Sequence, residues 1–226
     1  MNQNITISTT YLEKYHNMKS TTYELDFLIK YLEKTGKQFF GKHFRIYEHD
    51  HEIIYKLLVW FMGDLEKIEQ LGFDFKKGIL LSGPVGCGKT TLMSLMRHCA
   101  HSQRKPIIKS CRDISFEFIK NGYEVIQQFS RQAFEQNGSQ FQPKCYCFDD
   151  LGSEQNLKYF GNECNVMAEV LLSRYDLFIS QNMTTHITTN LSASEIEDFY
   201  GNRLRSRMRE MVNLISFDKS TNDKRK

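Results

Sequence analysis

One short stretch of this chain restricts its possible folds more than any other. Residues 83–90 read G-P-V-G-C-G-K-T and come one residue after the apolar run 78–81, G-I-L-L. The pattern G-x-x-x-x-G-K-[ST] between a strand and a helix curls the backbone so that successive N–H groups point inward. The amino-terminal end of the following helix adds its partial positive charge. We therefore expect a strand, a phosphate-binding loop and a helix that together hold a nucleotide triphosphate.

Individual side chains of this loop have predictable roles. Lys89 is expected to reach the β- and γ-phosphates of ATP, and the Thr90 hydroxyl is expected to bind Mg²⁺. The alternative is a glycine-rich turn that only joins strand to helix, but an eight-residue match flanked by both elements rarely arises by chance. The predicted nucleotide-binding residues are Gly83, Pro84, Val85, Gly86, Cys87, Gly88, Lys89, Thr90 and Thr91.

Composition narrows the class of protein. The chain has 226 residues and a net charge of +3, which is too small to indicate nucleic-acid binding by itself. Its N-terminus lacks the basic-then-apolar plan of a signal peptide, and its longest apolar run, residues 57–62, is too short to span a membrane. The six cysteines form no C-x-x-C pair, which argues against a zinc site. We expect a cytoplasmic protein that contacts no membrane.

From residue 78 onward, apolar strands alternate with helical patterns, which is typical of a parallel sheet covered on both faces. The predicted strands are 78–82, 106–111, 144–149, 183–189 and 212–217. The predicted helices between them are 89–102, 112–120, 123–135, 162–180, 192–199 and 201–210. Two earlier helices are predicted at 21–34 and from Asp50 onward, with a polar connection over 35–49.

An acidic motif follows about sixty residues after the phosphate loop. The run 145–150, C-Y-C-F-D-D, is an apolar strand that ends in Asp149 and Asp150. In nucleotide-hydrolysing proteins with such a loop, this strand lies beside the loop's own strand. Asp149 is therefore expected to help bind Mg²⁺, and Asp150 to act as general base toward the attacking water. A solvated Asp-Asp turn is the alternative, and the presence of the loop makes the catalytic interpretation the better one.

Polar residues nearer the C-terminus supply further candidates. Asn190 directly follows the strand 183–189 and is suited to contact the γ-phosphate or the attacking water, although asparagine also commonly caps a strand-end turn. The stretch 201–209 carries four arginines: Arg203, Arg205, Arg207 and Arg209. Their density indicates an anionic partner, either DNA or the γ-phosphate of a neighbouring subunit, with a solvated basic face as the alternative.

Arg174 is a secondary candidate because it falls on the apolar stripe of the predicted helix 162–180. A guanidinium buried there needs a carboxylate or phosphate partner. The alternative is a side chain that extends along the helix until its charged end reaches the rim. The sequence leaves both possibilities open.

Five motifs, in this order, carry a family resemblance: G-P-V-G-C-G-K-T, F-D-D-L-G-S-E, S-R-Y, I-T-T-N-L and G-N-R-L-R-S-R-M. They resemble the DnaC/DnaI helicase loaders and the IstB transposition helpers, which are AAA+ ATPases. The resemblance covers about residues 50–217 and implies an α/β P-loop NTPase fold, a five-stranded parallel sheet in an αβα sandwich without the helical lid. It implies that Asn190 is the first sensor, that Arg207 is an arginine finger reaching the adjacent subunit, and that Arg203 is a neighbouring box arginine.

The chain departs from this pattern at one position. Many relatives carry glutamate where this chain has Asp150. Because aspartate is one methylene shorter, the base would lie farther from the water, and hydrolysis is expected to be slow. Glu154, in the same loop, is a weaker candidate to assist. Slow hydrolysis suits a switch whose ATP-bound and ADP-bound forms differ in affinity for a partner.

The resemblance also implies a role. The protein would be a DNA-associated ATPase that uses ATP and Mg²⁺, forms homo-oligomers, binds single-stranded DNA, and loads a ring helicase or assists a transposase. Residues 1–49 would be a helical partner-docking region, residues 50–217 the ATPase core and residues 218–226 a basic, flexible tail. The alternatives are a small-molecule phosphotransferase similar to nucleotide kinases and a nucleotide-binding scaffold that does not hydrolyse ATP.

Overall fold

The computed structural model describes residues 22–101, 104–154, 157–159 and 162–225. Its helices are α2 (Thr22–Phe40), α3 (His51–Met62), α4 (Leu65–Gln70), α5 (Lys89–Met96), α6 (Cys111–Asn121), α7 (Glu124–Phe129), α8 (Val166–Gln181) and α9 (Ala193–Met211), with a 3₁₀ turn, η1 (Glu48–Asp50). Its strands are β1 (Gly78–Ser82), β2 (Ile107–Ser110), β3 (Phe134–Asn137), β4 (Gln140–Pro143), β5 (Tyr146–Leu151), β6 (Leu157–Tyr159), β7 (Asn162–Cys164), β8 (Thr185–Thr189) and β9 (Val212–Ser216).

The chain divides into two compact units between residues 55 and 56, within α3. In the first unit, the segment after α2 turns back on that helix: the Phe44 ring lies against Gly36, and the Ile46 N–H donates to the Glu33 carboxylate at 3.4 Å. Residues 1–21, which belong to the predicted docking region, lie outside the described residues. None of the helices that the structure describes is long and apolar enough to cross a membrane.

The second unit is built on one parallel sheet. Its five strands lie in the order β2-β5-β8-β1-β9. These are the five strands that the sequence predicts, so the predicted five-stranded parallel sheet is confirmed. The central strand, β8, pairs with β5 on one side and β1 on the other. The expectation that the acidic strand lies directly beside the strand of the phosphate loop is therefore wrong, because β8 separates β5 from β1.

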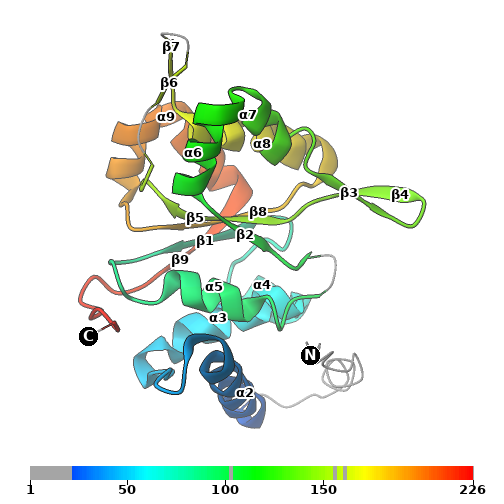
Figure 1. Cartoon of the computed structure of the whole chain (residues 1–226). Coiled ribbons are helices and arrows are strands. Elements are labelled where there is room, and N and C mark those ends of the chain that lie inside the picture. Colours follow the sequence, from blue (N-terminus) through cyan, green and yellow to red (C-terminus); the bar gives the residue numbers. More distant parts are fainter. Residues whose placement is uncertain (1–21, 102–103, 155–156, 160–161, 226) are drawn as a thin grey trace, which may run out of the picture. The chain divides into compact units, whose positions relative to one another are not determined.

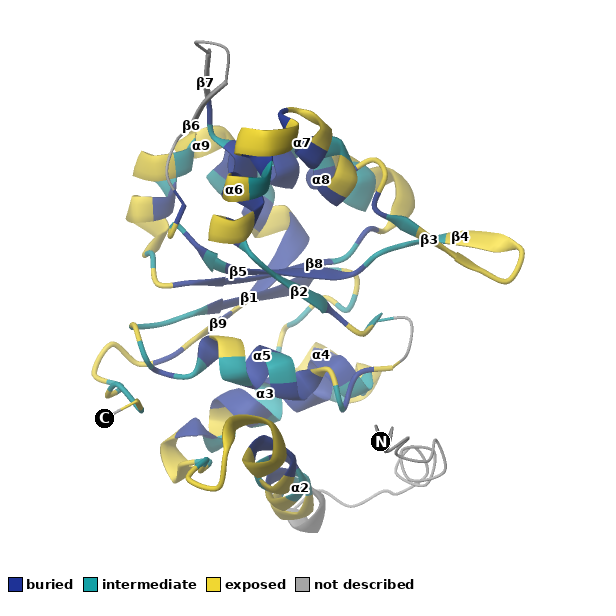
Figure 2. Ribbon diagram, viewed as in Figure 1, coloured by how far each residue is buried: buried dark blue, intermediate teal, exposed yellow. Residues whose placement is uncertain are grey.

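Helices cover both faces of this sheet. Figure 1 shows α6, α7, α8 and α9 on one face, and α4 and α5 on the other. The strands of the sheet are mostly buried between these layers, whereas the outer surfaces of the helices are exposed (Figure 2). The predicted αβα sandwich is therefore confirmed.

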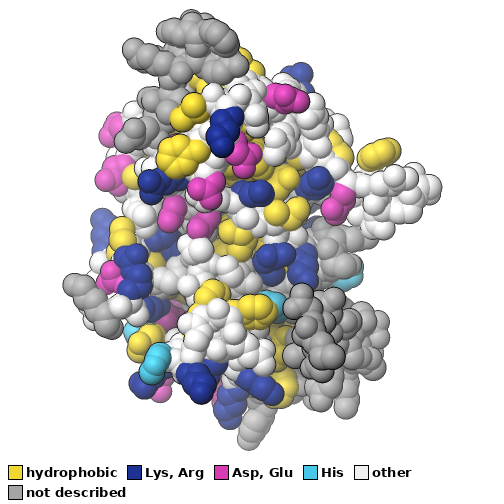
Figure 3. Space-filling model, in the orientation of Figure 1, with side chains coloured by type: hydrophobic (Ala, Val, Ile, Leu, Met, Phe, Trp, Pro, Cys, Tyr) yellow, Lys and Arg dark blue, Asp and Glu magenta, His cyan; other side chains and the backbone are white. Residues whose placement is uncertain are grey.

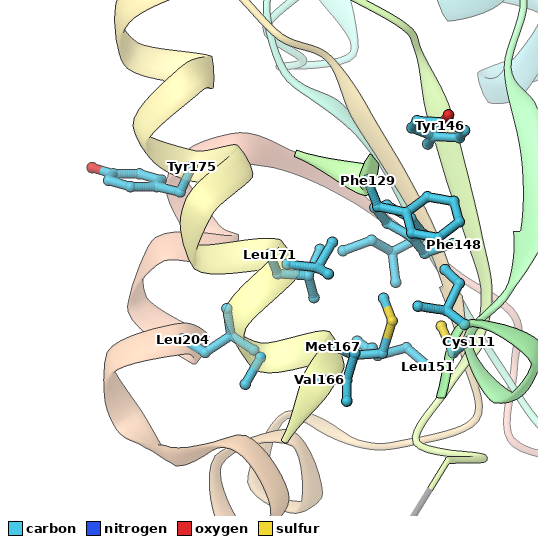
Figure 4. Close-up of a cluster of buried hydrophobic side chains, with 14 of the residues drawn as sticks. Cys111, Phe129, Tyr146, Phe148, Leu151, Val166, Met167, Leu171, Tyr175 and Leu204 are labelled. Carbon is cyan, nitrogen blue, oxygen red and sulfur yellow. The ribbon is translucent and has the colours of Figure 1, made fainter. Parts of the chain in front are cut away.

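The larger hydrophobic core lies between β5 and the layer formed by α6 to α9. In Figure 4, Phe148 of β5 faces Met167 and Leu171 of α8, with Leu204 of α9 beside them. All four side chains are fully buried. Each contributes about 1.5–3 kcal/mol relative to an exposed position. This packing holds β5, and with it the two acids near its end, in a fixed position.

On the other face, aromatic residues of α3 pack against the middle of the sheet. The rings of Trp60 and Phe61 lie 4.8 and 5.0 Å from the ring of His186 in β8, measured between centroids. The His186 Nδ1 atom accepts the N–H of Ile79 in β1 at 3.1 Å. Burial lowers the pKa of His186 to about 3, so the imidazole is neutral at physiological pH. His186 therefore helps to join two strands.

Several predicted helix boundaries are wrong. The helix predicted at 162–180 begins at Val166, because residues 162–164 form strand β7. The helix predicted at 89–102 ends at Met96. The helix predicted at 123–135 ends at Phe129, and residues 134–143 form the antiparallel hairpin β3–β4 instead. This hairpin is largely exposed (Figure 2) and turns at Asn137-Gly138, where Gly138 has a φ angle of 62°. A second short hairpin, β6–β7, was also not predicted.

Helix α2 is longer than predicted, whereas the break predicted within α9 is present. The polar connection predicted over 35–49 is helical as far as Phe40, because α2 continues to that residue. The predicted boundary between helices 192–199 and 201–210 is confirmed as a break within α9. Gly201 there has a φ angle of 85° and a ψ angle of 158°, which are not helical. Ser192 and Glu195 form a capping box at the start of α9.

Candidate functional site

The ends of three adjacent strands define the candidate site. β5, β8 and β1 lie side by side and run in the same direction. The carboxyl ends of parallel strands meet at one edge of a sheet, which is where α/β proteins bind ligands. At this edge β1 leads into the phosphate-binding loop, β5 carries Asp149 and Asp150, and β8 leads to Asn190.

The loop between β1 and α5 has the curled backbone that its glycines predict. Gly86 and Gly88 have φ angles of 81° and 101°, a region in which a side chain would be strained. Gly88 is also the N-cap residue of α5. The unpaired N–H groups of the first turn of α5 therefore adjoin the loop. Together they form a cradle suited to an anion.

Lys89 lies buried beside this loop, with 5% of its surface exposed. Its ammonium donates to the carbonyl oxygens of Gly83 and Pro84, both at 2.9 Å, and to Oδ1 of Asn190. These neutral acceptors compensate the charge less well than phosphate oxygens would, because charge-assisted hydrogen bonds are stronger. The structure thus brings together Lys89 at the start of α5 and Asn190 just after β8, two predicted site residues.

Thr90 and Asp149 form a second contact at the site. The Thr90 hydroxyl lies 2.9 Å from each carboxylate oxygen of Asp149, and the Thr188 hydroxyl donates to Asp149 Oδ1 at 2.7 Å. Burial raises the pKa of Asp149, whereas these hydrogen bonds from Thr188 and Thr90 lower it. Hydroxyl and carboxylate oxygens are the ligands that Mg²⁺ prefers. Thr90 and Asp149 therefore fit the predicted metal site.

Asp150 lies at an irregularity of β5. Between Phe148 and Leu151, β5 advances by one residue more than β8 does between Ile187 and Thr189. Such a β-bulge re-aims a side chain. The φ angle of Asp150 is 54°, which is uncommon outside glycine and is tolerated best by aspartate and asparagine. Irregular backbone of this kind concentrates at functional sites.

Thr188 is a site residue that the sequence analysis did not single out. Its hydroxyl donates to the Asp149 carboxylate and accepts the N–H of Asp150 at 2.9 Å. One side chain of β8 therefore orients both acids of β5. The only signal in the sequence is its spacing: Thr188 lies two residues before Asn190, and residues two apart on a strand share a face.

Glu154 is engaged elsewhere. Its carboxylate accepts hydrogen bonds from the Tyr200 hydroxyl and, at 2.9 Å, from the N–H of Gly152. Burial raises the pKa of this carboxyl group. These contacts join the loop after β5 to α9. Glu154 therefore holds this loop in place and is poorly placed to act as a second base.

Arg207 and Arg203 lie on the surface of α9, apart from the site of their own chain. Arg207 Nη1 donates to the Tyr175 hydroxyl at 2.9 Å and lies 3.5 Å from a Glu210 oxygen, with 40% of the side chain exposed. Tyr175 of α8 is itself buried and belongs to the hydrophobic core, at the edge of the cluster drawn in Figure 4. Arg203 is exposed and has no hydrogen-bond or ion-pair partner among the residues that the structure describes.

The other two arginines of α9 differ from each other. Arg205 forms an ion pair with Glu197 of the same helix. Arg209 is exposed, and its carbonyl oxygen accepts a hydrogen bond from the Lys77 ammonium at 3.2 Å. On the face seen in Figure 3, lysine and arginine side chains lie among aspartates and glutamates. The basic residues on that face are therefore interspersed with acidic ones.

Arg174 is fully buried at the opposite end of the strands. It donates to the Thr185 hydroxyl at 2.7 Å and to the carbonyl oxygens of Phe129, Lys144 and Thr184 at 2.9, 3.0 and 2.9 Å. Thr185 is the first residue of β8, so these groups lie at the amino ends of the strands. Burial lowers the pKa of Arg174 to about 10, and the guanidinium stays charged at neutral pH. The expectation of a carboxylate or phosphate partner is therefore wrong. Neutral hydroxyl and carbonyl oxygens accept the hydrogen bonds of the Arg174 guanidinium, away from the candidate site.

The remaining predicted nucleotide-binding residues belong to the loop or to the first turn of α5: Pro84, Val85, Cys87 and Thr91. Val85 is 58% exposed at the tip of the loop, whereas Cys87 is fully buried. Burial raises the pKa of the Cys87 thiol, which therefore stays protonated at neutral pH.

Comparison with known protein families gives one match that covers the site. Residues 79–214 match the model of the ATPase family associated with various cellular activities (AAA). This span extends from β1 to β9. It contains the phosphate-binding loop, Asp149, Asp150, Asn190 and Arg207. No curated protein matches the sequence.

Two solved structures have a similar fold. The crystal structure of the DnaC helicase loader matches with a TM-score of 0.52 and 17% sequence identity, covering 76% of this chain and 92% of that one. A proposed primosome component from Streptococcus pyogenes serotype M3 matches with a TM-score of 0.50 and 17% identity, covering 78% of this chain and 83% of that one. At this identity the likeness concerns the fold.

Proposed function

We propose that this chain, which belongs to the AAA family of ATPases, binds ATP with Mg²⁺ and hydrolyses the ATP to ADP and phosphate. The observation that carries the proposal is the meeting of four side chains at the carboxyl ends of adjacent strands: Lys89, Thr90, Asp149 and Asn190. A cation, a hydroxyl–carboxylate pair and a polar amide beside an amide-lined loop are the groups that phosphoryl transfer to water requires.

The Thr90 hydroxyl and the Asp149 carboxylate are the groups that would hold Mg²⁺. When bound, Mg²⁺ neutralises charge on the phosphate oxygens. The hydrogen bond that Asp149 receives from Thr188 favours its ionised form, which a cation ligand must have.

The other residues act on the triphosphate and the water. The Lys89 ammonium exchanges the carbonyl oxygens of Gly83 and Pro84 for phosphate oxygens, and the loop N–H groups bind the remaining phosphate oxygens. Asn190 orients the attacking water. Asp150 takes a proton from this water as its oxygen bonds to the γ-phosphorus and the bond to ADP breaks.

Thr188→Val should lower kcat about tenfold with little change in KM. The substitution keeps the shape of the side chain but removes the hydrogen bonds that orient Asp149 and Asp150. Steady-state phosphate release measures the effect. Thr188→Ser, which keeps the hydroxyl, is the matched control and should retain most of the activity. Equal rates for the valine variant and the unmodified protein would contradict this role.

Asp150→Glu should raise kcat about threefold, because the longer side chain brings the carboxylate closer to the attacking water. Single-turnover hydrolysis with protein in excess over ATP separates this step from product release. A large loss of activity would show instead that the bulge and its φ angle of 54° are built around the shorter acid.

We further infer that this ATPase serves DNA-associated machinery, as a helicase loader or a transposition helper. The order of its five sequence motifs supports this inference, as do the fold that it shares with the DnaC helicase loader and the exposed Arg203 and Arg209 on α9. In this proposal residues 1–49 dock the partner protein, and the protein forms homo-oligomers on DNA.

ATPase measurements across protein concentration, with and without single-stranded DNA, test the proposal. We expect the rate per chain to rise with both, because part of the site comes from a neighbouring subunit. Nucleotide binding without any hydrolysis would indicate a scaffold instead. A monomer that transfers phosphate only to a second small substrate would indicate a phosphotransferase.

A further inference from the structure

The C-terminal tail, residues 217–225, lies along the phosphate-binding loop. Figure 1 shows it beside the loop that leads into α5. The N–H of Phe217 donates to the carbonyl oxygen of Ser82 at 2.8 Å, which extends the pairing of β9 with β1. The Phe217 side chain packs so closely on Gly83 that a Cβ atom there would lie 2.6 Å from the Cβ of Phe217. The tail therefore begins at the base of the loop.

The other end of the tail reaches the tip of the same loop. Lys224 makes two contacts there: its N–H donates to the Gly86 carbonyl oxygen at 3.1 Å, and its ammonium donates to the Cys87 carbonyl oxygen at 2.6 Å. The Asp223 carboxylate lies against Gly86. Asp223 and Lys224 are half-buried, whereas Arg225 after them is exposed. The tail thus contacts the loop at both ends.

The second of these hydrogen bonds determines which way one loop amide points. In a trans peptide unit, the C=O and the following N–H point in opposite directions. The Cys87 carbonyl, turned toward the Lys224 ammonium, therefore turns the Gly88 N–H away from the tail. The Cys87 N–H instead donates to the Pro84 carbonyl oxygen at 3.4 Å within the loop. The Gly88 N–H belongs to the part of the loop that is expected to bind phosphate oxygens.

The charge of the tail also suits an anionic ligand. Asp223 forms an ion pair with Arg225 at 2.9 Å, which offsets its negative charge beside Gly86. The Lys224 ammonium stays close to the loop and would lie 3.8 Å from a Cβ atom placed on Gly88. A positive charge is therefore added next to the loop that receives the triphosphate.

From these contacts we propose that Lys224 is a positioning residue of the nucleotide site. Its ammonium holds the Cys87 carbonyl so that the Gly88 N–H faces the phosphates before ATP arrives. This inference rests on the proposed ATP binding. Its effect is on ATP affinity rather than on the chemical step, because the loop is ordered in advance of binding.

Calorimetric titration with a non-hydrolysable ATP analogue tests this role. Lys224→Ala and Lys224→Met should each raise the dissociation constant about fivefold, the equivalent of one lost hydrogen bond. The methionine variant keeps the alkyl chain that packs near Phe217, whose ring lies 5.0 Å from the Lys224 ammonium. Lys224→Arg should restore affinity to within about twofold of the unmodified protein.

Lys219→Ala is the matched control, because it removes the same charge from the same tail without a contact to the loop. Its affinity should match that of the unmodified protein. In ATPase assays the Lys224 variants should raise KM and leave kcat unchanged. Two results would overturn the inference: Lys224 variants that bind like the Lys219 control, or variants that bind more tightly. Failure of the unmodified protein to bind the analogue would overturn the proposed function itself.

Discussion

Lys89→Ala is expected to lower kcat/KM for ATP hydrolysis about 1000-fold. The substitution removes the ammonium that contacts Gly83, Pro84 and Asn190, and that is expected to bind the β- and γ-phosphates. Phosphate release and binding of a fluorescent ATP analogue measure the two consequences separately. Both should fall, because the same cation contributes to binding and to charge stabilisation in the transition state.

The matched control for this variant is Lys76→Ala, which removes an exposed lysine just before β1. It should leave both measurements unchanged. Thermal unfolding of the nucleotide-free proteins distinguishes a folding defect from a site defect. Hydrolysis by the folded Lys89→Ala protein at more than a tenth of the normal rate would show that the phosphate-binding loop is not the site of reaction.

Arg207→Ala is expected to lower DNA-stimulated ATP hydrolysis about 1000-fold while ATP binding is retained. An arginine that reaches the γ-phosphate of a neighbouring subunit stabilises the transition state and contributes little to ground-state binding. In the isolated chain, Arg207 contacts Tyr175 and Glu210 on the surface and does not reach its own site. Arg131→Ala is the control, since it removes the same charge from an exposed position outside α9.

Mixing two inactive variants tests the same assignment more directly. An Arg207→Ala chain has an intact Asp150, and an Asp150→Asn chain has an intact Arg207. In a mixed oligomer the second chain can complete the site of the first, so activity above the sum of the separate proteins is expected. No gain on mixing, under conditions in which the two variants co-elute as oligomers, would exclude action between subunits.

The five strands of the sheet could be predicted because local and global signals agree in them. Each is a short apolar run, and each lies between helical patterns that favour parallel pairing. The backbone of the phosphate-binding loop could also be predicted, because glycine readily adopts the positive φ angles found at Gly86 and Gly88. These positions depend little on residues distant in sequence.

The β3–β4 hairpin could not be predicted from the same signals. Its strands contain polar residues such as Gln136 and Gln142 and are largely exposed, so no alternation of apolar and polar residues marks them. The end of α5 at Met96 was equally hidden, since residues 97–100 continue the helical pattern but form turns. In both segments, pairing and tertiary packing override local preference.

The partners of individual side chains were the least predictable part. The apolar stripe left open whether Arg174 is buried, and it did not predict that carbonyl oxygens at the amino ends of strands would surround the guanidinium. The hydrogen bonds of the Thr188 hydroxyl and of Lys224 were unpredictable for the same reason. Each depends on residues brought together from separate strands or from the end of the chain. Local sequence patterns do not predict contacts between residues that are far apart along the chain.

The short path from β8 to α9 has a mechanical consequence. Asn190 follows β8 directly, and only Leu191 and the capping residue Ser192 separate it from the first turn of α9. Because the connection is this short, a shift of Asn190 on nucleotide binding would move the first turn of α9 with it. The non-helical backbone at Gly201 is the point at which the arginine-bearing half of α9 could turn separately.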